Sequence, residues 1–271
     1  MRVHFIGIGG IGLSALARFL NFDGHSVSGS DMKSSSITKE LEKEGIKVSC
    51  PQEAKNISDD LDLVIYSAAV TDENPELIEA RLKQIRTLSR KEALPIILGD
   101  KKNYCVAGAH GKSTTTAILA TILQSSALIG AISKEFGSNF RYVDKTVAFE
   151  ADESDASFLL SNPYCAIVTN AEPEHMEYYH YDYDKFYESY ETFLSLAKKR
   201  VVNGEDKDIQ KLKIEDATYL YPSKDIKNLC YTLKDGQPCT KFDLKDYGTF
   251  EVWGFGFHIA SNASLAIMAA L

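Results

Sequence analysis

The sequence has few cysteines, no long hydrophobic run and no excess of basic residues, and each absence narrows the class of protein. The five cysteines are widely spaced and form no C-x-x-C pair, so the sequence indicates neither a disulfide framework nor a structural zinc site. No apolar run reaches the roughly 18 residues that span a bilayer, and the first residues lack the segments of a secretory signal. A formal net charge of -8 argues against nucleic acid as a partner. We therefore expect a cytoplasmic protein with reduced thiols and no membrane partner.

Short apolar runs alternate with amphipathic stretches along the chain, which is typical of strands and crossover helices in a parallel sheet. With 271 residues, of which 44% are hydrophobic, the chain is long enough for about two domains. We predict an α/β fold in which an N-terminal Rossmann-like parallel-sheet domain (1–99) precedes a central P-loop α/β ATP-binding domain (100–271). The boundary is placed within "LGDKKN" (98–103), where glycine and charge interrupt the pattern.

Individual elements follow from the same periodicity. In the first domain we predict strands at 3–6, 25–29, 63–66 and 86–88, and helices at 13–22, 37–44, 75–82 and 90–98. In the second we predict a strand, glycine loop and helix over 104–123 and further strands at 146–149, 165–169 and 200–202. Residues 206–249 give no clear pattern. A helical pattern at 258–271 reaches the last residue without a stop signal, so we expect the chain to be part of a longer protein.

Three glycines follow the first predicted strand, in "VHFIGIGGIGLSALA". Gly7, Gly9 and Gly12 have the G-x-G-x-x-G spacing that turns a chain tightly and points a helix N-terminus at a diphosphate. Asp31 follows about twenty residues later, where a dinucleotide-binding unit places its ribose contact. Taken alone, this motif predicts an NAD-dependent dehydrogenase.

A second glycine loop, "GAHGKST" (108–114), lies between a predicted strand and a predicted helix, which is the context of a phosphate-binding loop. Backbone N–H groups would face a phosphate at the helix N-terminus, Lys112 would add positive charge, and the Ser113 hydroxyl can ligate Mg²⁺. The loop is shorter than the common G-x-x-x-x-G-K-[ST]. Val106 occupies the place of that pattern's first glycine, and Gly108 stands three residues before Gly111.

Polar clusters follow the next two predicted strands. The first cluster holds four carboxylates, Glu150, Asp152, Glu153 and Asp155. The second holds Asn170, Glu172, Glu174, His175 and His180. Because ligands of open α/β sheets bind beyond the carboxyl ends of strands, we expect these clusters to share one crevice with the phosphate loop. Carboxylates are Mg²⁺ ligands, although a solvated acidic loop would have the same composition.

The ordered motifs resemble those of the Mur ligases, the ATP-dependent amino-acid ligases of peptidoglycan precursor synthesis. "GAHGKSTTT" is similar to the family's G-T-H-G-K-T-T-T, "EADESDASFL" is close to its usual form, and "IVTNAEPEHME" is similar to its I-V-T-N-[IL]-E-x-D-H-[ML]-D. "GIGGIGLSALA", "GSD", "SAAVTDENPE" and "SRKEALPIIL" resemble stretches of the family's first domain. The resemblance covers almost the whole chain and is weakest between residues 206 and 249.

The resemblance implies roles for individual residues. The ATP-binding residues would be Gly108, Ala109, His110, Gly111, Lys112, Ser113, Thr114, His258 and Asn262. The catalytic residues would be Lys112, Glu150 and His175, and the Mg²⁺ ligands Ser113, Glu150 and His175. The UDP-sugar ligands would be Gly7, Gly9, Gly10, Ile11, Gly12, Asp31 and Ser67. In "GFHIASN", Phe257 and Ile259 replace the family's arginine and asparagine beside the adenine.

The implied activity joins L-alanine to the lactyl carboxylate of UDP-N-acetylmuramate through an acyl phosphate, with ATP and Mg²⁺. Family members carry a third, C-terminal domain that is not in this sequence, so we expect the chain alone to ligate poorly or not at all. Three alternatives stay open: a ligase that attaches a whole tripeptide to the same UDP-sugar, an NAD(P)-dependent oxidoreductase, and a non-catalytic nucleotide-binding module. The sequence carries no signal of oligomeric state.

Overall fold

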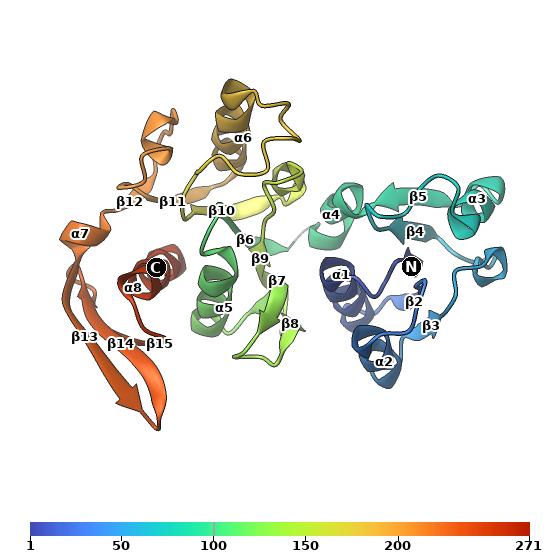
Figure 1. Cartoon of the computed structure of the whole chain (residues 1–271), viewed down its shortest axis with the longest axis horizontal. Helices are drawn as coiled ribbons and strands as arrows, with labels where there is room; N and C mark the ends of the chain where they lie inside the picture. Colours follow the sequence, from blue (N-terminus) through green and yellow to red (C-terminus); the bar gives the residue numbers. More distant parts are fainter. Residues whose placement is uncertain (100) are drawn as a thin grey trace. The chain divides into compact units, whose positions relative to one another are not determined.

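The computed structural model describes residues 1–99 and 101–271 and divides the chain into two compact units (Figure 1). The first unit comprises Met1–Gly99 and Leu128–Tyr142, and the second comprises Asp100–Ala127 and Val143–Leu271. Residues 128–142 therefore group with the first unit, although the sequence assigns them to the second predicted domain. Residue 100, where that domain is predicted to begin, lies outside the described residues.

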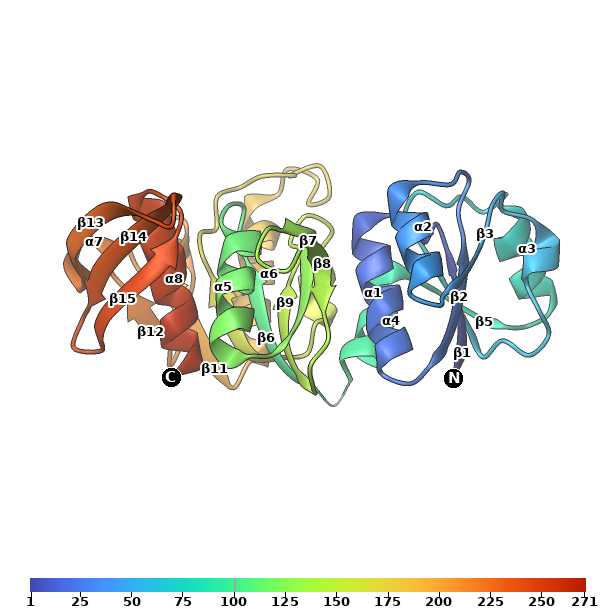
Figure 2. The same ribbon diagram turned by 90° about the horizontal axis from the view of Figure 1, so that it is seen from below.

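The first unit is built on a parallel sheet of order β3-β2-β1-β4-β5. Its strands are β1 (Arg2–Ile6), β2 (Ser26–Ser30), β3 (Lys47–Ser49), β4 (Leu63–Tyr66) and β5 (Arg86–Ser89). Helices α1 (Ile11–Phe22), α2 (Ser36–Lys43) and α4 (Arg90–Leu98) lie on one face, and α3 (Pro75–Leu82) lies on the other (Figure 2). A short 3-10 helix, η1 (Ala54–Asn56), precedes β4.

Local sequence explains where two of these helices begin. Asn74 caps α3 by accepting hydrogen bonds from the next turn, and Pro75 occupies the first helical position, where a missing N–H is tolerated. Ser89 and Glu92 form a reciprocal capping box at the start of α4. Both helices have the bounds that the sequence predicts.

A buried carboxylate ties together several elements of the first unit. Glu76, fully buried in the first turn of α3, accepts hydrogen bonds from the Ser30 hydroxyl, from Asn56 Nδ2 at 2.6 Å and from Glu53 N at 3.2 Å. His4 Nε2 lies 3.5 Å from the same carboxylate. Burial is the largest influence on the Glu76 carboxyl and raises its pKa. The adjacent His4 ring and the hydrogen bonds from Ser30 and Asn56 outweigh burial, and the pKa lies below its ordinary value.

The second unit contains most of a sheet of order β12-β11-β10-β6-β9-β7-β8, in which the strands from β12 to β9 are parallel. The strands are β6 (Lys102–Ala107), β7 (Ser126–Ser133), β8 (Ser138–Arg141), β9 (Thr146–Glu150), β10 (Pro163–Val168), β11 (Lys199–Asn203) and β12 (Thr218–Leu220). Helices α5 (Lys112–Leu123) and α8 (Phe257–Ala270) pack together on one face, and α6 (Tyr183–Leu196) covers the other (Figure 1). Two short 3-10 helices, η2 (Ser157–Leu160) and η3 (Ile209–Lys211), lie between strands.

The region without a clear sequence pattern forms a separate antiparallel sheet. A short helix, α7 (Pro222–Asp225), leads into strands β13 (Ile226–Lys234), β14 (Gln237–Leu244) and β15 (Gly248–Trp253). This sheet packs against α8, and Phe242 and Leu244 of the middle strand are fully buried. The sequence also did not predict β3, β7, β8 or β12.

The α/β class, with a parallel-sheet unit followed by a unit built on a mixed sheet, is confirmed. Within residues 1–99 and 101–271, the structure contains no helix that is both long and apolar enough to cross a membrane.

Candidate functional site

The predicted phosphate loop connects β6 to α5, as its sequence context requires. Strand β6 is almost entirely buried, and the chain turns at Gly108 (φ +132°) and Gly111 (φ +85°) before α5 begins at Lys112. The positive φ angles are accessible to glycine and strained for other residues. The free N–H groups of the first turn of α5 therefore point to the end of the loop, which is an arrangement that binds anions.

The two residues that follow strand β10, Thr169 and Asn170, lie directly against this loop. A Cβ atom at Gly108 would lie 2.3 Å from Thr169 Oγ1 and 2.7 Å from the Asn170 carbonyl oxygen. Parallel pairing of β6 with β10 creates this approach, because Ala107 lies opposite Val168 and both strands end at the same edge of the sheet. A glycine is therefore required three residues before Gly111.

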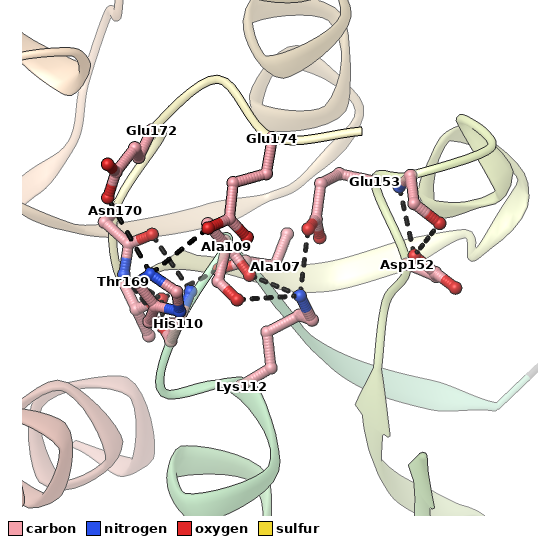
Figure 3. A network of polar contacts seen from close by, with 12 residues as sticks. Ala107, Ala109, His110, Lys112, Asp152, Glu153, Thr169, Asn170, Glu172 and Glu174 are labelled. Carbon is pink, nitrogen blue, oxygen red and sulfur yellow. Dashed lines mark hydrogen bonds and ion pairs between the residues drawn. The ribbon is translucent and has the colours of Figure 1, made fainter. Parts of the chain in front are cut away.

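Asn170 and Thr169 hold the backbone of His110 (Figure 3). The Asn170 side chain accepts a hydrogen bond from His110 N at 3.1 Å and donates one to His110 O at 2.8 Å. The Thr169 hydroxyl donates to the same carbonyl at 2.6 Å. The Asn170 amide thus binds both the N–H and the C=O of His110, as a neighbouring strand would in a sheet. The shape of the loop therefore depends on side chains that directly follow strand β10.

Lys112 lies across the loop. Its Nζ donates to Gly108 O at 2.5 Å and contacts Ala109 O at 3.4 Å and Glu153 Oε1 at 2.9 Å (Figure 3). The Lys112 side chain is 17% exposed and that of Glu153 is 5% exposed, so this ion pair is largely withdrawn from water. The ammonium group thus lies at a loop with the backbone geometry for phosphate, and in this structure its charge is paired with Glu153.

Among the four carboxylates at the end of β9 and directly after it, Glu153 forms an ion pair with Lys112. Burial raises the pKa of Glu153, although the charge and hydrogen bond of Lys112 oppose that rise. Its second oxygen, Oε2, is buried without a hydrogen-bond partner among the described residues. The predicted catalytic carboxylate, Glu150, is the half-buried last residue of β9 and pairs in register with Val106 of β6. Spacing places both acids near the loop but does not tell which side chain faces Lys112.

The segment after β10 contributes a histidine–carboxylate cluster at the outer side of the loop. His110 Nε2 lies 3.4 Å from Glu174 Oε1 and 3.8 Å from Glu172 Oε2, and these contacts are ion pairs when His110 is protonated. His175 is exposed and has a left-handed backbone with φ +52°. None of the contacts described for residues 1–99 and 101–271 joins the His175 ring to the phosphate loop.

The fit of the loop to Mg²⁺ depends on its oxygen donors. In the part of the chain that the structure describes, no three His, Cys, Asp or Glu side chains gather to hold a metal ion by themselves. Mg²⁺ does not need such a group, because one or two carboxylates plus substrate phosphates suffice. Ser113 and Thr114 are half-buried at the start of α5, and Glu153, whose Oε1 contacts Lys112, has a second hard oxygen donor, Oε2, without a hydrogen-bond partner among the described residues. These residues fit the ion.

Helix α8 brings a further predicted residue to the loop. A Cβ atom at Gly111 would lie 2.7 Å from Asn262 Oδ1, so the Asn262 amide packs on the loop itself. His258 is exposed and precedes Asn262 by one helical turn on the same side of α8. Phe257 is 44% exposed at the first position of the helix, and Ile259 packs against Gly254.

The first glycine loop lies at the carboxyl ends of β1, β2 and β4. Gly7 has φ +84°, and its Cα is so close to Ser67 that an added Cβ would lie 3.0 Å from the Ser67 Cβ. Gly9 N donates to Asp31 Oδ2 at 2.9 Å. The structure therefore brings Gly7, Gly9, Asp31 and Ser67 together, with the Asp31 carboxylate bound to the loop.

The remaining predicted residues of this loop lie at the start of α1. Gly10 is the exposed N-cap, Ile11 is 43% exposed, and an added Cβ at Gly12 would lie 3.2 Å from Arg90 Nε. The close approach of Arg90, from α4, is not indicated by the motif.

Comparison of the sequence with known protein families finds a match in each half of the chain. Residues 2–102 match the Mur ligase family, catalytic domain, and residues 106–270 match the Mur ligase middle domain. The whole chain is 58% identical to the UDP-N-acetylmuramate–L-alanine ligase of Campylobacter curvus (strain 525.92), and 50% identical to the protein of that name from Helicobacter pylori (strain P12). It spans 62% and 60% of the lengths of these two relatives.

Structural comparison agrees. The crystal structure of UDP-N-acetylmuramate-alanine ligase MurC from Thermotoga maritima is similar to this chain with a TM-score of 0.85 and 29% sequence identity. The similarity covers 99% of this chain and 64% of that one.

Proposed function

Because this chain belongs to the Mur ligase family, we propose that its two units bind the nucleotide sugar and the ATP of a cytoplasmic ligase that joins L-alanine to UDP-N-acetylmuramate. The observation that carries the proposal is the second glycine loop. It combines glycines at positive φ, a helix N-terminus and a largely buried lysine, and it occurs in a chain 58% identical to a ligase of that name.

In the proposed reaction the lactyl carboxylate takes the γ-phosphoryl group of ATP, and the amine of L-alanine then attacks the acyl phosphate and releases phosphate. Such transfer requires positioning and charge neutralisation more than covalent help from the protein. Lys112 would neutralise the β- and γ-phosphates, and the N–H groups at the start of α5 would orient them. Gly108 would let the loop turn beside Thr169 and Asn170, and the Asn170 side chain would hold the backbone of His110 in place.

Bound Mg²⁺ would supply charge neutralisation at the transferred group. We propose that Ser113 and Glu150 hold one ion, with Glu153 as a further carboxylate, and that His175 holds a second. His258 and Asn262 would lie along the nucleoside, with Ala109, His110, Gly111 and Thr114 lining the phosphates.

We propose that the first glycine loop receives the diphosphate of the UDP-sugar. Gly7, Gly9, Gly10, Ile11 and Gly12 would face the phosphates, with Ser67 at the end of β4 beside them. The Asp31 carboxylate accepts from Gly9 N, so its proposed part is to shape the loop.

The proposal predicts two separable binding sites in this chain, which isothermal calorimetry can test. Lys112→Ala should weaken ATP binding in the presence of Mg²⁺ by about a hundredfold, since it removes a charged partner of the phosphates, and should leave UDP-N-acetylmuramate binding unchanged. Gly9→Ala should do the opposite, because the new Cβ would lie 2.8 Å from Asp31 Oδ2. Lys185→Ala, an exposed lysine on α6, is the control.

The division of roles is wrong if either variant loses both ligands while its thermal unfolding is unchanged. Binding of NADH instead of UDP-N-acetylmuramate, abolished by Gly9→Ala, would support an oxidoreductase.

A further inference from the structure

Glu153 is a buried carboxylate that has Lys112 as its charged partner. Its residue is 3% exposed, Oε1 lies 2.9 Å from Lys112 Nζ, and Oε2 has no hydrogen-bond partner within residues 1–99 and 101–271 (Figure 3). An unpaired buried carboxylate oxygen costs free energy, so the stability of this arrangement depends on the single contact with the ammonium group.

The backbone at Glu153 is held in place from two sides. The Tyr179 hydroxyl, which is buried, donates to Glu153 O at 2.6 Å, and Ala156 N donates to the same oxygen at 3.1 Å. These two bonds fix the backbone from which the buried Glu153 side chain extends. Burial raises the pKa of Glu153 despite the adjacent lysine, which agrees with a charge that the site barely compensates.

Phosphate and Glu153 require the same ammonium group. In this structure Lys112 Nζ is occupied by Gly108 O, Ala109 O and Glu153 Oε1. A nucleotide phosphate that binds Lys112 has to displace one or more of these three acceptors. Where it displaces Glu153, it leaves a buried carboxylate without its counter-charge and close to further negative charge. Removing one partner of a buried pair is strongly unfavourable.

We propose that Glu153 holds Lys112 in the nucleotide-free state and thereby makes tight nucleotide binding depend on a divalent cation. This proposal rests on the proposed function of the loop. The cation neutralises the carboxylate that the phosphates release, for which the unpaired Oε2 is a suitable oxygen donor. Glu153 is thus a coupling residue between two ligands, in addition to any part it takes in holding the ion.

The test measures ATP affinity by calorimetry with EDTA and with Mg²⁺, for the unmodified chain and for Glu153→Gln. In EDTA, Glu153→Gln should bind ATP about tenfold more tightly than the unmodified chain, because coupling between sites is typically 5–150-fold. The factor by which Mg²⁺ increases affinity should fall in the variant. Asp152→Asn is the matched control, since it removes an equal charge from the adjacent residue, whose carboxylate accepts hydrogen bonds from Ser154 N and Oγ.

Equal or weaker metal-free binding by Glu153→Gln would overturn the proposal, as would an equal gain in Asp152→Asn, which would indicate a general charge effect. If Glu153→Gln does not fold, Glu153→Met makes the same comparison with an apolar side chain of similar length. Failure of the proposed function gives a different result, because the unmodified chain would then bind no ATP in either buffer and Lys112→Ala would change nothing.

Discussion

Replacing Glu76 with glutamine should destabilise the first unit by about 2 kcal/mol at neutral pH. The carboxylate receives three hydrogen bonds, from Ser30, Asn56 and Glu53, in a fully buried position. Glutamine keeps one acceptor oxygen, which can serve Asn56 and Glu53, but turns an amide donor toward Ser30 and removes the charge that strengthens each bond. The expected loss corresponds to about one hydrogen bond to a charged group, which contributes roughly 1.5–3 kcal/mol.

The effect should depend on pH in a defined direction. Burial raises the Glu76 pKa, but the adjacent His4 ring and the hydrogen bonds from Ser30 and Asn56 together lower it below its ordinary value. A lowered folded-state pKa gives stability that is fully present above the unfolded-state pKa of about 4.3 and is lost as the pH falls through the folded-state value. The difference between the unmodified chain and Glu76→Gln should therefore be constant near neutrality and shrink below about pH 4.3.

Amide hydrogen exchange in β1 and β2 is the appropriate assay, because the one tryptophan, Trp253, lies in the second unit. A loss of about 2 kcal/mol should accelerate the slowest exchange there by roughly thirtyfold. Glu79→Gln, on the same helix but with a partly exposed carboxylate that contacts Lys83, is the control and should leave exchange unchanged. The reasoning fails if the two variants behave alike, or if the Glu76→Gln effect persists undiminished at pH 3.

Two further predictions concern the phosphate loop. Gly108→Ala should destabilise the second unit by at least about 2 kcal/mol, because φ is +132° and the new Cβ would lie 2.3 Å from Thr169 Oγ1. Urea unfolding followed by Trp253 fluorescence measures this loss, and a stability equal to that of the unmodified chain would contradict it. Asn170→Ala should weaken ATP binding about tenfold with little loss of stability, because it releases His110 N and leaves His110 O with the Thr169 hydroxyl as its side-chain donor. Asn203→Ala, which removes a contact to Thr169 O, is the calorimetric control, and equal effects of the two variants would argue against a specific role of Asn170.

The elements that the sequence predicts are those whose boundaries carry a chemical signal. Helices α3 and α4 begin at side-chain caps, and their predicted and observed bounds agree. Strand β7 was not predicted because only Gln124 and Ser125 separate it from α5, and neither glycine nor proline marks the break. Helix α5 ends at Gln124 in a left-handed conformation, a place where sequence rules expect glycine. The sheet of β13, β14 and β15 was missed because most β13 residues are exposed, so that strand lacks the alternation of buried and exposed residues by which a strand is recognised.

The candidate site, too, could be predicted from the sequence only in part. The glycine loop and Lys112 follow from spacing and context, but the carboxylate that meets Lys112 does not. After β9 the chain turns through Ala156, which has φ +56°, and Phe158 N donates to Asp152 O. This turn directs Glu153 inward while Asp152 caps Ser154. The spacing of acidic residues in the sequence does not predict such a turn. The choice of Glu150 as the catalytic residue therefore rests on the family resemblance alone.

The two glycine loops share a feature that motif spacing cannot express. In the first, Gly9 N donates to the Asp31 side chain at the end of β2. In the second, His110 N donates to the Asn170 side chain, which follows β10. In each loop, one backbone N–H therefore donates a hydrogen bond to a side chain that follows a neighbouring parallel strand. A glycine-rich loop has high conformational entropy, and anion binding alone would have to order it. The bracing side chains order both loops before a ligand arrives, so less binding free energy is lost in ordering them. Asp31 lies at the position of a ribose contact, yet its hydrogen bond makes it part of the loop's own structure.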